Sequence, residues 1–319
     1  MRVWNHITEE AAGYPFALSE AVVAAEENSP GILVPIDTGA MVVASDYSGQ
    51  HKTATHEAYT FLVTSDQDLK EWLPTLHEFR TGWLPDGRSL SYKKLKERVR
   101  WKAFPHFLKT VGTLRANVIT VMVSRGVGSF FGGTPDQLIA AMPDCFPNCT
   151  RHSTVEKMFR HATFMALITA ALRREEQSMF WVSDHDETLD SHDRREGFAK
   201  LTSYLTHGLT RWQQPGDCWF GTTELEEAPH WAEDLTAIAD IFAGCYCEMS
   251  GVLPAFFGIR KWLVSTQASV ADDRARALGD WLASRPPRLC HLLLRLELDS
   301  QGEVRASAQA VVGRGPTGL

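Results

Sequence analysis

Hydrophobic positions along the chain predict short strands separated by helices. The run from Met41 to Asp46 is apolar and partly β-branched and is followed by Ser48-Gly49, a pattern that predicts a buried strand ending on an aspartate. Similar runs predict strands at 58–64, 116–123, 179–182 and 218–221. Apolar residues at helical spacing predict helices at 18–27, from about 66 onward, and at 153–177, 194–207, 230–249 and 270–284.

This order of elements predicts an α/β fold. The first three strands are expected to pair antiparallel and the helix-linked strands to follow, in a mixed five-stranded sheet flanked by helices. Residues 289–298 and 303–312 flank Asp299-Ser300-Gln301-Gly302, which predicts a hairpin. We therefore expect an N-terminal extension (1–38), a main domain (39–250) and a C-terminal helix and hairpin addition (251–319).

Composition narrows the class of protein. The formal charge of −7 excludes a wholly basic nucleic-acid binder, although a nuclease with acidic catalytic residues and a local basic groove is compatible with it. Six cysteines in 319 residues are not a disulfide framework, and no apolar run reaches the length of a membrane span. The N-terminus has no apolar segment typical of a signal peptide. A cytoplasmic protein that does not associate with membranes is the expectation.

Three acidic sites carry the candidate chemistry. Asp46 ends the first strand, and Asp184, Asp186 and Glu187 follow the strand at 179–182. Asp240 lies in an apolar helix with small neighbours at helical spacing, which would let that helix approach a sheet closely. Each site also has an ordinary interpretation: an Asx turn at Asp46, a polar loop at 184–187, and an Asp–Arg pair at Asp240.

One metal centre would explain all three sites. Carboxylates are natural ligands of Mg²⁺ and Mn²⁺, and two such ions activate water against a phosphodiester without a side-chain nucleophile. The hypothesis assigns Asp46, Asp184 and Asp240 as catalytic residues. The expected ligands of Mg²⁺ or Mn²⁺ are Asp46, Asp184, Asp186, Glu187 and Asp240.

The most basic stretch of this acidic chain runs from 88 to 102. Its charges commonly mark only a solvated helix face, but clustering in an acidic chain also suits phosphate contact, with Tyr92 and Trp101 as stacking groups. The candidate nucleic-acid-binding residues are Arg88, Lys93, Lys94, Lys96, Arg98, Arg100 and Lys102.

Over roughly 40–250, the chain resembles domain-of-unknown-function family 3800 (DUF3800), whose fold is ribonuclease-H-like. Asp46-Tyr47-Ser48-Gly49 resembles the family's Asp-Glu-Ser-Gly opening, the 239–244 segment resembles its late Ala-Asp helix motif, and 179–187 resembles its middle strand ending in an acid. The resemblance implies a ribonuclease-H-like fold and metal-dependent phosphodiester hydrolysis, in the context of phage defence or mobile elements. Tyr47 stands where the family usually has Glu, and Ala237 where it usually has Gln.

These two departures keep a second hypothesis open: an inactive ribonuclease-H-like module that binds nucleic acid or a partner protein. A third is a glycosyltransferase, because Asp184-x-Asp186 matches the Asp-x-Asp signature that holds Mn²⁺ in sugar-nucleotide transferases. The leading expectation is a nuclease with RNA or DNA as substrate, and a homodimer or a protein partner is compatible with it.

Overall fold

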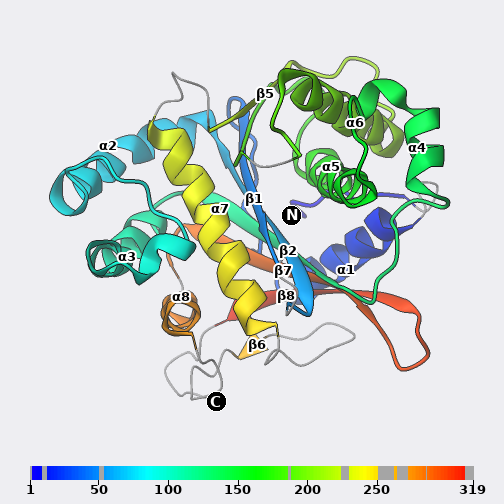
Figure 1. Cartoon of the computed structure of the whole chain (residues 1–319). Helices are drawn as coiled ribbons and strands as arrows, with labels where there is room; N and C mark the ends of the chain where they lie inside the picture. Colours follow the sequence, from blue (N-terminus) through cyan, green and yellow to red (C-terminus); the bar gives the residue numbers. More distant parts are fainter. Residues whose placement is uncertain are drawn as a thin grey trace.

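A mixed sheet forms the middle layer of the fold (Figure 1). The computed structural model describes residues 2–8, 13–49, 54–185, 188–223, 230–250, 262–263, 272–284 and 286–312. The strands lie in the order β5-β4-β1-β2-β3-β7-β8-β6. Their bounds are β1 Met41–Ser48, β2 His56–Ser65, β3 Ala116–Ser124, β4 Met179–Ser183, β5 Cys218–Thr222, β6 Trp262–Leu263, β7 Leu289–Leu298 and β8 Val304–Val312.

The strand pairing follows the predicted scheme in the first half of the sheet. β1 pairs antiparallel with β2, and β2 pairs antiparallel with β3. The helix-linked strands come next, since β4 pairs parallel with β1 and β5 pairs parallel with β4. These five strands are the five that the sequence predicts, and the protein has the expected mixed α/β architecture.

The C-terminal hairpin enlarges this sheet beyond the five expected strands. β7 pairs parallel with β3, and β8 pairs antiparallel with β7. Leu292, Leu293 and Leu294 are all buried, so β7 is covered on both faces. Consecutive apolar residues are typical of an inner strand, which explains why this hairpin lies within the sheet and not on its surface.

Helices cover both faces of the sheet, and alternate side chains of β1 point to opposite faces. Met41 and Val43 point into a core formed with α1, α5 and α6, whereas Val42 and Ala44 point into a core formed with α2, α3, α7 and α8. Figure 1 shows α7 crossing over β1 and β2, with α5 and α6 beyond the sheet. The bounds are α1 Tyr14–Asn28, α2 Asp66–Trp83, α3 Arg98–Val111, α4 Pro135–Ala141, α5 His152–Leu172, α6 His192–Thr210, α7 His230–Met249 and α8 Asp273–Ala283, with short 3₁₀ turns at η2 Lys93–Lys96 and η3 Pro143–Cys145.

The predicted helices are all present, within a few residues of their expected bounds. Local capping sets some of these bounds: the Ser65 hydroxyl accepts a hydrogen bond from the Asp68 N–H, and α2 begins directly after Ser65. α3 and α4 are not among the helices that the sequence predicts. Within the part of the chain that the structure describes, none of the helices combines the length and apolar character that a bilayer span requires.

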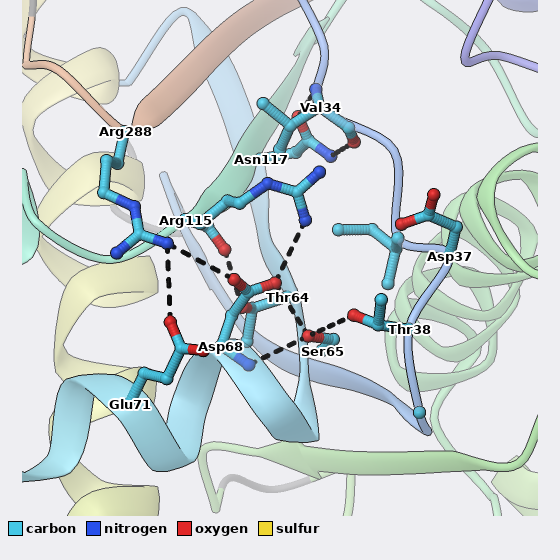
Figure 2. Close-up of polar contacts among 12 residues, drawn as sticks. Val34, Asp37, Thr38, Thr64, Ser65, Asp68, Glu71, Arg115, Asn117 and Arg288 are labelled. Atoms are coloured by element: carbon cyan, nitrogen blue, oxygen red, sulfur yellow. Dashed lines mark hydrogen bonds and ion pairs between the residues drawn. The ribbon is translucent and has the colours of Figure 1, made fainter.

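Ion pairs tie the start of α2 to the beginnings of β3 and β7 (Figure 2). The Asp68 carboxylate accepts a hydrogen bond from Arg115 Nη1 at 3.1 Å and lies 3.6 Å from Arg288 Nη2. Arg288 also lies 3.7 Å from Glu71. Met41, the first residue of β1, pairs with Ser65, the last residue of β2. The cluster on α2, which follows Ser65, therefore lies next to the start of β1. It fastens the segment before β7 to the sheet at the end remote from Asp46.

Candidate functional site

Asp46 and Asp184 lie side by side on neighbouring parallel strands. Asp46 is buried within β1, opposite Thr60, and the strand continues two residues beyond the predicted end. Ser45 pairs with Ser183, and the Asp184 N–H donates to the Ser45 carbonyl at 3.1 Å, just where β4 ends. Side chains alternate along strands, so both aspartates share the sheet face that α7 covers.

Asp240 reaches this pair from α7. Its carboxyl group accepts a hydrogen bond from the Tyr92 backbone N–H and shares another with the carboxyl group of Asp46. Burial raises the pKa of Asp240, the two hydrogen bonds oppose that rise, and the charge of Asp184 adds to it. The structure thus brings together three aspartates that lie far apart in sequence.

A hydrogen bond between two carboxyl groups has a direct chemical implication. Two ionised carboxylates repel each other, so the contact between Asp46 and Asp240 requires a shared proton or a cation in its place. An all-oxygen donor set of this kind fits Mg²⁺ or Mn²⁺. In the described ranges, no group of three or more Asp, Glu, His or Cys side chains is placed to hold a metal ion, so the three aspartates do not form a ready-made metal site. The predicted ligands Asp186 and Glu187 lie outside the described residues.

Tyr92 is held in place by two further residues, neither of which the sequence predicts in this role. The Tyr92 ring packs against Gly244 of α7, where a Cβ atom would lie only 2.3 Å from the ring. On α8, the Arg274 guanidinium lies 3.8 Å from the centre of the same ring, and its Nη1 donates to the Tyr92 carbonyl at 3.0 Å. Asp272 pairs with Arg274. These contacts hold the residue Tyr92, whose backbone N–H binds Asp240.

The basic stretch 88–102 therefore passes the acidic site at Tyr92. The charge of Lys93, the residue after Tyr92, lowers the pKa of Asp240 and partly opposes its rise. Among the predicted nucleic-acid contacts, Lys93, Lys94, Lys96, Arg98 and Lys102 are exposed.

Other residues in the stretch have structural partners. Arg88 pairs with Asp86, and Arg100 is buried, pairs with Glu97 and donates to the Ser89 carbonyl. Tyr92 is buried and therefore cannot stack on a base, which corrects that expectation, whereas Trp101 is exposed.

The arginine-paired aspartate on α7 is Asp234. Its carboxylate is fully buried and binds the guanidinium of Arg80. The groups that act on Asp240 are instead a backbone N–H, two aspartates and the charge of Lys93. The two buried acids of α7 therefore differ in kind, and the ordinary interpretation of an Asp–Arg pair belongs to Asp234.

Tyr47 and Ala237, the two positions where the sequence differs from the motifs it resembles, do not join these carboxylates. Tyr47 packs on the opposite face of the sheet, beside Tyr59 and His161. Ala237 is buried in the core between α7 and the sheet.

A scan against protein-family models finds no family that matches the chain, and a search of curated proteins finds no significant match.

Proposed function

We propose that the chain is a divalent-metal-dependent nuclease of ribonuclease-H-like fold that hydrolyses phosphodiester bonds of RNA or DNA. The observation that carries this proposal is the meeting of Asp46, Asp184 and Asp240 at the point where β4 leaves the sheet. The sheet supports the fold assignment, because three antiparallel strands are followed by two helix-linked parallel strands.

The three aspartates would hold Mg²⁺ or Mn²⁺. Bound there, two such ions supply an activated water and stabilise the charge on the attacking and leaving oxygens of a phosphodiester. The chain's own groups orient the ligands: the Tyr92 N–H points at Asp240, and the β1–β4 pairing sets Asp184 beside Asp46.

The exposed lysines of the basic stretch would bind phosphate groups. Because Lys93 acts electrostatically on Asp240, a strand bound along Lys93, Lys94 and Lys96 would lie next to the carboxylates. Local positive charge beside an acidic site reconciles nucleic-acid binding with a chain whose net charge is −7.

The test is cleavage of labelled RNA and DNA with Mg²⁺, with Mn²⁺ or with EDTA. We expect cleavage only with a metal, and loss of at least two orders of magnitude in rate in Asp46→Asn and Asp240→Asn. Asp136→Asn is the matched control, since Asp136 is exposed on α4 and pairs with His152 at the surface. Full activity in Asp240→Asn would refute the assignment.

Two further measurements separate the alternatives. Retention of RNA or DNA on a gel, without metal binding by calorimetry, would favour an inactive binding module. Hydrolysis of a nucleotide sugar without cleavage of nucleic acid would favour the Asp-x-Asp transferase.

A further inference from the structure

Phe180 of β4 and Trp219 of β5 form an exposed aromatic pair on the sheet. They are register partners, their ring centroids lie 4.6 Å apart, and their planes are 14° apart, so the rings are stacked. Phe180 is 43% exposed and Trp219 is 47% exposed. Large aromatic rings are usually buried, so two stacked and exposed rings at one place call for a functional explanation.

The pair lies on the same face of the sheet as the carboxylates. Along β4, Phe180, Val182 and Asp184 alternate onto one face, and Val182 packs into the α7 side of the core. On β5, the same alternation takes Trp219 to Thr223, whose hydroxyl donates to Asp184 at 3.1 Å. The four-residue interval from Phe180 to Asp184 corresponds to about 13 Å of extended strand.

Among the helices that the structure describes, α7 lies to one side of this pair. α7 packs on β1 and β2, and β5 is the outermost strand of the sheet (Figure 1). Within the described part of the chain, the face of β4 and β5 is therefore continuous with the acidic site, and its two rings are exposed to a ligand that enters from the sheet edge.

We propose that Phe180 and Trp219 are a base-stacking platform, and that the substrate is single-stranded nucleic acid. This inference rests on the proposed function and narrows its substrate class. An unpaired base can stack on an aromatic side chain, whereas the bases of a duplex are already stacked on each other. A span of about 13 Å holds about four stacked nucleotides between the platform and Asp184, at about 3.4 Å each.

The size of the patch favours a base over a protein partner. Two aromatic rings that are each less than half exposed offer about 200 Å². A stable protein interface buries about 800 Å² on each partner. One or two stacked bases match the smaller area, and the basic stretch 88–102, which contacts Asp240 through Tyr92, would supply phosphate contacts next to the same carboxylates.

The test measures binding apart from cleavage. Fluorescence anisotropy in EDTA gives the Kd of a labelled 12-nucleotide single strand, as RNA and as DNA, and of the duplex of the same sequence. We expect Trp219→Leu and Trp219→Ala to weaken single-strand binding about tenfold and to leave duplex binding unchanged. Loss of one stacked base is worth about 1–3 kcal/mol, and tenfold corresponds to about 1.4 kcal/mol.

Three variants make the result specific. Trp219→Leu keeps apolar bulk for folding but removes the ring, and Trp219→Phe should keep most of the single-strand affinity. Tyr204→Ala is the control, because Tyr204 is an exposed aromatic residue on α6, the helix on the other face of the sheet.

The platform is overturned if Trp219→Leu binds the single strand as tightly as the unmodified protein, if the unmodified protein prefers the duplex, or if the substitution dissociates a dimer in light scattering. Trp219-dependent binding without any cleavage would refute the nuclease and keep the platform, whereas cleavage without dependence on Trp219 would do the reverse.

Discussion

Replacing Gly244 by alanine tests the contact that positions Asp240. A Cβ atom at this position would lie 2.3 Å, 2.4 Å and 2.8 Å from three carbon atoms of Tyr92, where favourable contacts between carbon atoms begin at about 3.5 Å. The ring has to retreat by about 1 Å, yet Arg274 lies 3.8 Å from its centre. The displacement therefore disturbs the Tyr92 N–H that binds Asp240.

The expected loss of stability follows from two opposing terms. Overpacking a buried contact costs about 1–3 kcal/mol. Alanine in a helix interior is favoured over glycine by about 1 kcal/mol, which offsets part of that cost. We expect Gly244→Ala to lower the free energy of unfolding by up to about 2 kcal/mol. If Asp240 is a metal ligand, as proposed, Mn²⁺ binding should also weaken severalfold, because its carboxylate is no longer oriented.

The assay is urea unfolding with and without Mn²⁺, combined with calorimetric titration of Mn²⁺. Gly208→Ala on α6 is the matched control: no atom lies within 4 Å of its added Cβ, so it should gain up to about 1 kcal/mol from helix propensity alone. The difference between the two variants isolates the packing cost. Equal stability changes in both variants, with unchanged Mn²⁺ affinity, would refute the role assigned to Tyr92.

Three further predictions follow from the same structure. Arg274→Met should keep much of the packing on Tyr92 but lose the hydrogen bond to its carbonyl, so Mn²⁺ affinity should fall more than unfolding free energy; an equal loss in both would make Arg274 purely structural. Because burial raises the pKa of Asp240, a proton on this carboxyl group competes with the metal. Calorimetry should show that Mn²⁺ affinity falls with decreasing pH, and that the fall begins at a pH above the ordinary pKa range of aspartate. Asp240→Asn should lack this pH dependence. Burial lowers the pKa of His161 and of His291 to about 3, so near pH 5 only the unfolded chain binds these protons. The free energy of unfolding should therefore be at its full value above about pH 6.5 and fall by about 2 kcal/mol per histidine by pH 5. Urea titrations in which His161→Gln does not reduce this fall would contradict the prediction.

The local pattern of apolar and polar residues was sufficient to predict most of the helices and strands. The apolar run at 41–46 and the alternating run at 58–64 are strands in the structure, and the helix expected near Asp66 begins there. These predictions succeeded because each element buries one continuous apolar face. The extent of β1 was underestimated, since polar residues such as Tyr47 and Ser48 continue it by pairing with β2.

The local sequence pattern did not predict which distant segments pair with each other. The chain from 289 to 312 reads as a hairpin in isolation, and only the structure pairs β7 with β3. In the same way, nothing local indicates that Gly244 faces Tyr92, because the small residues around Asp240 suit close packing against any partner. The available signal was a glycine in the interior of an apolar helix, which usually has a packing reason.

The acidic site follows from strand order more than from any motif. Parallel neighbours end at the same edge of a sheet, so Asp46 and Asp184 meet only because β4 lies directly beside β1. If β5 separated these strands, the two acids would lie about 10 Å apart at the usual strand spacing. α7 then crosses β1 and carries Asp240 onto the pair, while Tyr92 brings the basic stretch to the same place. A motif search that treats the three acids separately therefore finds three weak signals, and their chemical meaning comes from the order of the strands.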